Sequence, residues 1–180
     1  CHVNPAVSLA MWLNGRMKFG EFIGYVVSQF IGAAIGGGFL YWFVSMAPEF
    51  QFGGITEACA GHAECNLATN VIQPGANAGM ALLMEGLFTF FFVLVVLGAT
   101  DARQGFGKFA GLAIGLVNIG VIPVDSCSVS PARSFGPALW WPEAWPDFWI
   151  MVVGPVVGAI IAVLCWTAIS NYRNRKAIEE

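Results

Sequence analysis

The amino-acid sequence predicts an all-α membrane protein, and three observations support this: the composition, a set of long apolar stretches and an internal repeat. Of the 180 residues, 57% are hydrophobic and only 11% are charged, and the mean hydropathy is +0.70. A soluble domain typically carries about a quarter charged residues. Lipid is therefore the expected surrounding for most of the surface. The net charge of −3 and the lack of a basic run with interleaved aromatic residues indicate no nucleic-acid partner.

Four apolar stretches are candidates for membrane-spanning helices. A span needs roughly 20 predominantly apolar residues. The stretches are Phe22–Val44, Met80–Thr100, Phe109–Val124 and Phe148–Ser170. The third is shorter than the others, so we expect it to cross the bilayer with little length to spare.

The Lys and Arg residues predict the orientation of these spans. Most of them flank the spans on alternate connections: Arg16, Lys18, Arg103, Lys108, Arg173, Arg175 and Lys176. The 45–79 connection has no Lys or Arg, and the 125–147 connection has only Arg133. Because cytoplasmic loops carry the excess of cations, the 101–108 loop and the C-terminus are predicted to be cytoplasmic. Arg133 is then the only cation predicted on the outer side, so its presence there must be explained by its local surroundings.

An internal repeat divides the chain into two related halves. A shift of 126 positions brings Pro5-Ala6 onto Pro131-Ala132 and Gly32-Ala33 onto Gly158-Ala159. Two copies with an odd number of crossings each form an inverted pair, an arrangement common in transport proteins. We expect three spans and one re-entrant segment per half, so two spans are expected before Cys1 and the chain is predicted to be incomplete at its N-terminus.

The repeat also gives predicted boundaries. Residues 1–44 form the end of the first repeat, with one half-helix and one span, and residues 45–78 form an outer loop. Residues 79–170 form the second repeat, with two spans, a half-helix and a last span. Residues 171–180 form a cytoplasmic tail.

The repeated Pro-Ala elements are predicted to start two short helices. Asn4 and Ser130 are good N-cap residues, and the prolines after them occupy the first helical position, where the missing N–H costs nothing. A helix from Pro5 to about Leu13 is about 14 Å long, half the hydrocarbon thickness. Taken singly, either motif also fits an ordinary capped helix. Two half-helices that enter from opposite faces bring their positive N-termini together, where they repel cations and orient a neutral solute.

These two motifs are also the residues on which the chain resembles a known family. Asn4-Pro5-Ala6 and Ser130-Pro131-Ala132, the second followed by Arg133, look like the two signature boxes of the aquaporin (major intrinsic protein) family. The likeness runs through the whole chain and is greatest to the bacterial aquaporin Z group. It implies an aquaporin-like inverted repeat with four spans and two half-helices present and the first two helices of the family missing.

The resemblance assigns roles to individual residues. Asn4 and Ser130 are expected to donate hydrogen bonds to a water molecule at the waist of a pore. Arg133 is expected to form the outer constriction with Asn118 and Cys127, and Glu85 to brace a loop. The backbone carbonyls expected to accept hydrogen bonds from a file of water are those of Cys1, His2, Ser126, Cys127 and Ser128.

The function that these features predict is passive transmembrane passage of water, without enzymatic activity, cofactor or metal. A facilitator of glycerol or another small neutral solute is the first alternative, because Asn118 falls where water-selective members of the family have His. A non-conducting membrane scaffold of the same fold is the second, in which the short third span and Ser130, where the family usually has Asn, close the pore. By resemblance we expect a multi-pass homotetramer in the plasma (inner) membrane. Cys59, His62 and Cys65 form a weak metal pattern, for which a disulfide or free thiols is the favoured reading.

Overall fold

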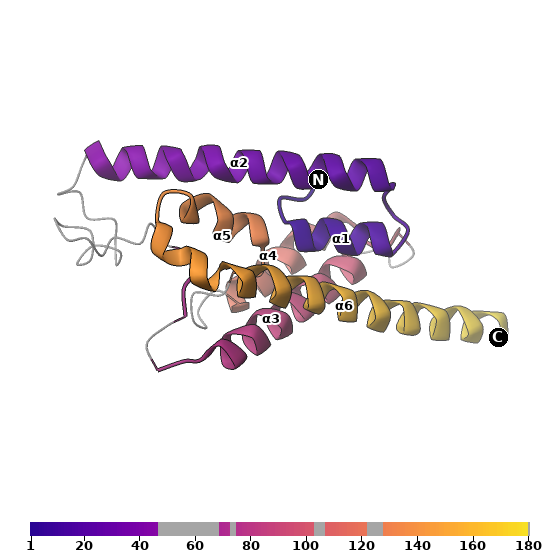
Figure 1. The fold of residues 1–180 in the computed structure, drawn as a ribbon. Helices are drawn as coiled ribbons and strands as arrows, with labels where there is room; N and C mark the ends of the chain where they lie inside the picture. The colour runs from indigo at the N-terminus through magenta and orange to yellow at the C-terminus, as the bar shows by residue number, and fades with distance from the viewer. Residues whose placement is uncertain (47–68, 73–74, 103–106, 122–127, 180) are drawn as a thin grey trace.

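A computed structural model describes residues 1–46, 69–72, 75–102, 107–121 and 128–179, and all its regular elements are helical (Figure 1). The α-helices are α1 (Pro5–Leu13), α2 (Phe19–Met46), α3 (Ala78–Ala99), α4 (Ala110–Val121), α5 (Pro131–Ala138) and α6 (Trp145–Glu179). The short 3-10 turns η2 (Gly107–Phe109) and η3 (Pro142–Ala144) precede α4 and α6. The prediction of an all-α chain is confirmed.

The two short helices α1 and α5 form the middle of the molecule. α2 lies along one side of both, and α6 lies along the other side (Figure 1). α3 packs most extensively against α6, and α4 packs on α3. α1 is embedded where these helices meet, and the largest apolar core joins α1, α3 and α6 through Ala6, Val7, Ala10, Met11, Val93, Val96, Leu97, Ala159, Ala162, Val163 and Trp166.

The start and end of α1 follow from its sequence. The side chain of Asn4 accepts a hydrogen bond from the backbone N–H of Ala6 at 2.8 Å, and Pro5 occupies the first helical position. Gly15 ends the helix with φ +73, a left-handed conformation that glycine adopts readily. With 9 residues, α1 is about 14 Å long and covers about half of the hydrocarbon thickness.

α5 is built in the same way. The hydroxyl of Ser130 accepts from the backbone N–H of Arg133 at 3.4 Å, and Pro131 follows the cap. The helix contains Pro137 and ends one residue later, after 8 residues. Because a proline within a helix removes a backbone donor, α5 stays short, as its sequence predicts.

Three helices of the described part of the chain are long and apolar enough to cross a membrane. They are the segments Phe19–Met46, Ala78–Ala99 and Pro142–Tyr172, with mean hydropathies of 1.5, 2.4 and 2.5. α4, on the third predicted stretch, has 12 residues and is about 18 Å long, which is less than a full crossing. Residues 122–124, which complete that stretch, lie outside the described residues.

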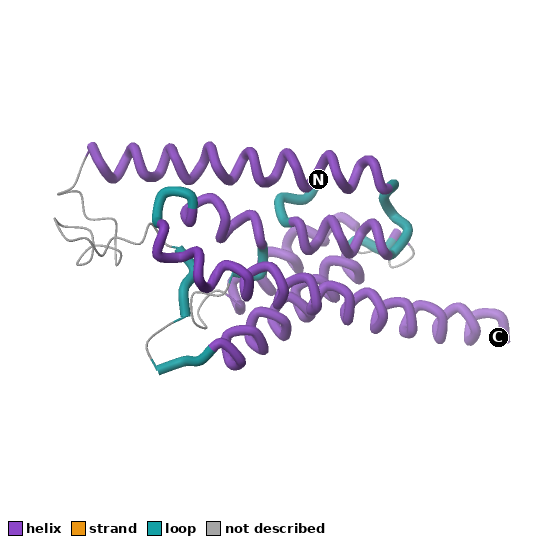
Figure 2. Tube along the Cα trace, in the orientation of Figure 1, coloured by secondary structure: helices purple, strands orange, loops and turns teal. Residues whose placement is uncertain are grey.

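The internal repeat is visible in the helix boundaries. α1 and α5 begin at Pro5 and Pro131, and α2 and α6 begin at Phe19 and Trp145, so both pairs are separated by the predicted 126 positions. The segments that lead into α1 and α5 both lie between the two helices, which therefore point away from each other (Figure 2). α6 continues to Glu179, so the predicted tail at 171–180 is largely helical.

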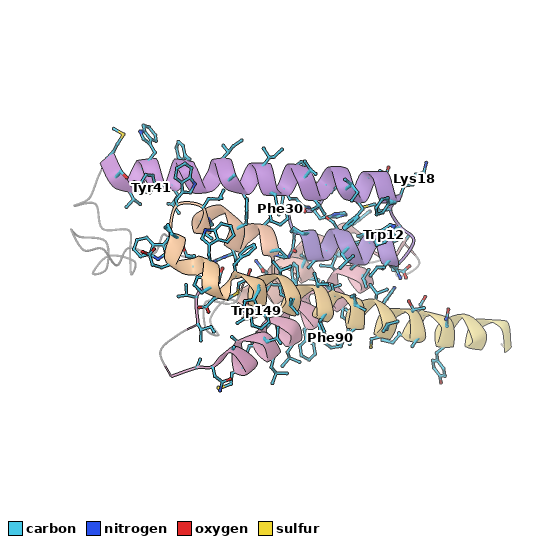
Figure 3. All side chains as sticks on the ribbon, in the orientation of Figure 1. Trp12, Lys18, Phe30, Tyr41, Phe90 and Trp149 are labelled. Atoms are coloured by element: carbon cyan, nitrogen blue, oxygen red, sulfur yellow. The ribbon has the colours of Figure 1, made fainter. Side chains whose placement is uncertain are left out.

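Aromatic contacts attach α2 to the middle layer. Phe30 points from α2 toward α5 (Figure 3) and meets Phe135 edge-on, with ring centroids 4.9 Å apart. Tyr41 stacks on Trp140 beyond the end of α5, with centroids 5.4 Å apart. α2 therefore packs on both short helices through one of its faces, and Gly37 is the only residue of this helix that is buried.

Candidate functional site

The N-terminal ends of α1 and α5 meet at the centre of the molecule. The amide nitrogen of Asn4 donates to the backbone carbonyl of Val129 at 2.8 Å, although the two residues are 125 positions apart. Asn4 and Ser130 are both buried, at 9% and 7% exposed. Each helix start carries about half a positive charge from its unpaired backbone N–H groups. The meeting point therefore concentrates hydrogen-bond donors and positive potential in a site with little access to bulk water.

Glu85 of α3 holds the segment that leads into α5. One carboxylate oxygen accepts from the backbone N–H of Ser128, and the other accepts from that of Val129 at 2.9 Å. Val129 has φ +55, a conformation that is strained for a β-branched residue. The two hydrogen bonds to a buried charged group thus stabilise a backbone turn that would otherwise relax.

On the side of α1, a group of hydrogen bonds centres on the hydroxyl of Ser8. It donates to the carbonyl of Asn4 at 3.2 Å and accepts from Nε2 of Gln29 at 2.9 Å. Nδ1 of His2 lies 3.1 Å away. The His2 ring therefore belongs to the same hydrogen-bond group as Ser8 and Gln29. Gln29 also donates to the carbonyl of His2 at 2.9 Å.

On the side of α5, the corresponding group centres on Ser134. Its hydroxyl lies 2.6 Å from Oδ1 of Asn70 and 2.5 Å from Oγ of Ser128. The hydroxyl of Ser128 in turn contacts the carbonyl of Ser130 at 2.7 Å. Nη1 of Arg133 donates to the same Oδ1 of Asn70. The guanidinium is therefore tied to the segment before α3 by a side-chain oxygen that it shares with Ser134.

The two groups are related by the repeat. His2 and Ser8 lie 126 positions before Ser128 and Ser134, and each pair is in contact across its own loop. A carboxamide completes each group, although these two are not related by the repeat: Gln29 lies on α2, and Asn70 lies in the connection before α3. The fold therefore repeats a local hydrogen-bond pattern as well as a helix pair.

A groove leads away from the meeting point along α1. It has a volume of about 470 Å³ and extends from the Cys1–Asn4 segment to Arg16 and Thr100. One wall carries the polar groups of the segment before α1. The opposite walls are apolar and come from α1, α3 and α4, through Val7, Met11, Phe92, Val96 and Ile114. Such a combination of a polar strip and apolar walls suits a small neutral molecule that is led from one hydrogen bond to the next.

Arg16 lines the far end of this groove. Its guanidinium donates to the hydroxyl of Thr100 at 2.9 Å and to the carbonyl of Leu97 at 3.1 Å, and lies 3.8 Å from the carboxylate of Asp101. These contacts join the turn after α1 to the end of α3. They fix the relative positions of two elements that line the groove.

Some of the predicted site residues lie at the helix starts or in the groove, one lies elsewhere, and others fall outside the described residues. Pro5, Ala6, Pro131 and Ala132 are buried at the two helix starts, and Cys1 and His2 line the groove. Asn118 has an exposed side chain on α4, so its place beside Arg133 stays a prediction. Ser126 and Cys127 lie outside the described residues, as do Cys59, His62 and Cys65.

Sequence reasoning missed the parts played by Gln29 and Asn70. The hydroxyls that these two carboxamides contact could have been predicted, because Ser8 and Ser134 occupy equivalent positions in the repeat. Nothing in the sequence near Asn70 indicates a contact with Arg133, because the two residues are 63 positions apart and belong to different elements.

Comparisons with known proteins give the family. The model of the major intrinsic protein family matches residues 1–166. The chain is 35% identical over 170 residues to aquaporin-5 of Mus musculus and 34% identical to aquaporin-5 of Rattus norvegicus. It spans 58% of the length of each of these relatives, and the matches cover 92% of this chain.

The fold has a counterpart among solved structures. The X-ray structure of the aquaglyceroporin from Plasmodium falciparum superposes with a TM-score of 0.70 at 19% identity, covering 91% of this chain and 70% of that one. At this identity the likeness concerns the fold. The family match over residues 1–166 shows that the chain belongs to the major intrinsic protein family.

Proposed function

We propose that this chain forms part of a passive transmembrane channel for water. The observation that carries the proposal is the meeting of two buried half-helix starts, joined by the hydrogen bond from Asn4 to Val129. Two helix N-termini directed at one point stabilise the oxygen of a neutral solute and repel a cation, including a hydrated proton. Water is then the expected solute and ions are excluded.

The side chains at the waist supply the donors. Asn4 uses one of the two hydrogens on its amide nitrogen for Val129, so the second is available to water. Ser130 accepts from Arg133 with its oxygen, so its hydroxyl hydrogen is available. In the groove, the backbone carbonyls of Cys1 and His2 accept from water along the polar wall. Ser126, Cys127 and Ser128 are proposed to supply equivalent carbonyls on the outer side.

Arg133 is proposed to form the outer constriction together with Asn118 and Cys127. A guanidinium has five donors and a permanent charge, so it binds water through hydrogen bonds while it repels cations. Glu85 is proposed as the brace that keeps the loop before α5 in place, through its contacts with Ser128 and Val129.

The finer assignments belong to the same proposal. Within the family we place the chain nearest the aquaporin Z group of bacteria, as a homotetramer in the plasma membrane with a cytoplasmic C-terminus. Two further spans before Cys1 are expected to complete the first repeat. We propose that the chain acts as a passive channel and not as an enzyme.

Water flux in proteoliposomes tests the proposal. Stopped-flow shrinkage of vesicles with the full-length natural protein should exceed that of protein-free lipid. Arg133→Val should retain water flux but admit glycerol and protons, because it removes the charge and widens the outer constriction. Lys108→Val, which removes an exposed cation far from the waist, is the matched control and should behave as the wild type.

The same measurement separates the alternatives. Flux equal to that of lipid alone in every variant would rule out a channel and leave the non-conducting scaffold. Glycerol uptake by the wild type that keeps pace with water flux would favour the solute facilitator.

A further inference from the structure

The strongest observation outside the predicted site is a buried asparagine that two functional side chains share. Asn70 is 1% exposed, and its Oδ1 contacts both Nη1 of Arg133 and the hydroxyl of Ser134. Its neighbour Thr69 is also buried, at 2% exposed. The segment that carries both residues is fixed from the other side, because the backbone N–H of Ile72 donates to the carboxylate of Asp147 at 3.0 Å.

The repeat explains why an amide oxygen is needed here. The counterpart of Arg133, 126 positions earlier, is the apolar Val7. In that half, the carboxamide of Gln29 presents its nitrogen to Ser8. Next to Arg133, the carboxamide of Asn70 presents its oxygen to Ser134. A guanidinium has only donors, so a carboxamide beside Arg133 must present its oxygen to pair with it, as Asn70 does.

We propose that Asn70 is a positioning residue that fixes the guanidinium of Arg133 and thereby sets the selectivity of the outer constriction. A neutral amide holds the guanidinium in one orientation without cancelling its charge, which a carboxylate would do. The contact to Ser134 keeps the amide oxygen in place, and Ser134 is joined through Ser128 to the cap of α5. This inference rests on the proposed channel function and adds the residue that orients its filter.

Two readouts test the proposal. The first is the ratio of water flux to glycerol flux in proteoliposomes of the full-length natural protein. Asn70→Ala should lower this ratio about tenfold, the effect of losing one hydrogen bond to a charged group. Asn70→Asp keeps an acceptor oxygen and should restore the ratio, while its charge should raise the leak of protons.

The second readout does not depend on conduction. The rate at which phenylglyoxal modifies Arg133 should rise in Asn70→Ala, because the guanidinium loses the hydrogen bond to Asn70, and should stay low in Asn70→Asp. Asn70→Leu fills the same volume without an acceptor and replaces the alanine variant if that variant does not fold. Asn77→Ala is the matched control, since it removes the N-cap of α3 and so destabilises a helix without touching Arg133.

The outcomes are distinguishable. A wild type without flux defeats the channel function but leaves the phenylglyoxal test of Asn70 intact. Flux ratios and modification rates in Asn70→Ala or Asn70→Leu equal to those of Asn77→Ala would overturn the inference. An aspartate variant that behaves as the alanine variant would overturn it too, because the oxygen would then not be the group that matters.

Discussion

Glu85 shows how one buried side chain controls the backbone of the candidate site. Its two oxygens accept from consecutive backbone N–H groups, and the second of these belongs to Val129, whose φ of +55 is strained. A carboxylate is suited to this task because both of its oxygens are strong acceptors. The conformation of the loop before α5 therefore depends on a residue of α3.

Replacing Glu85 by glutamine tests this dependence. Glu85→Gln keeps one acceptor but sets an NH₂ group against a backbone N–H, so we expect a loss of about 1–3 kcal/mol in the free energy of unfolding. The thermal unfolding temperature in detergent and the water flux should both fall. Glu143→Gln, an exposed carboxylate in η3, is the control and should change neither. An unchanged unfolding temperature in Glu85→Gln would show that the loop holds its shape without the carboxylate.

The sequence predicted the residues of the two boxes and the bracing role of Glu85, but not the contacts that Gln29 and Asn70 make to them. The sequence could predict Asn4 and Ser130 because an N-cap residue followed by proline is a local signal. The repetition of this motif excluded the reading as an ordinary capped helix that a single copy leaves open. Asn70 had no such signal, since its partner Arg133 is brought to it only by the packing of α5 against the segment before α3. Local chemistry is readable in one stretch of sequence, whereas a contact between distant segments depends on the tertiary fold.

At the scale of elements, close helix crossings decide where α5 lies. A Cβ atom added to Gly37 of α2 would lie 2.3 Å from the backbone oxygen of Gly136 of α5. A Cβ atom added to Gly158 of α6 would lie 2.2 Å from the backbone oxygen of Gly86 of α3. Small residues at such crossings let helices in a membrane approach through direct backbone contact. The half-helix α5 is thus pressed against a long helix.

Two neighbouring glycines of α2 provide a matched test. Gly37→Ala should push α5 away from α2, because the added carbon meets backbone that has little room to move, at a cost of about 1–3 kcal/mol. Since α5 carries Arg133, water flux should fall as well. Gly36→Ala places the same atom in open space, with nothing within 4 Å, and should be neutral. Equal flux and equal unfolding temperatures for the two variants would contradict the crossing.

The glycine run of α2 and the length of α4 also show what a sequence pattern leaves open. The run Gly36-Gly37-Gly38 indicates a close helix approach, yet only the contacts in space show which glycine makes it. In the same way, the apolar stretch at Phe109–Val124 predicts a span, and the structure describes a helix of 12 residues within it. Hydropathy reports the solvent that a segment prefers, whereas the bounds of its helix come only from the structure.

At the scale of the whole molecule, long-range contacts define two ends. At one end, Arg16 after α1 meets Asp101 after α3. At the other end, Ile72 before α3 meets Asp147 at the start of α6. The first end carries the exposed cation Lys18 and the second carries the exposed Glu143. This distribution agrees with the positive-inside rule if the first end is cytoplasmic, with α1 entering from that side and turning back.

Labelling of single cysteines tests this arrangement in the full-length natural protein. With its own cysteines replaced by serine, Asn77→Cys should react with a membrane-impermeant maleimide in right-side-out vesicles, because Asn77 is exposed at the start of α3, which the proposed orientation places on the outer side. Asn14→Cys and Lys108→Cys should react only in inside-out vesicles. Asn14 is the decisive position, since a re-entrant α1 returns it to the side from which the chain entered. If Asn14→Cys reacts in right-side-out vesicles together with Asn77→Cys, α1 crosses the bilayer, the starts of α1 and α5 cannot meet at its centre, and the pore built on them does not exist.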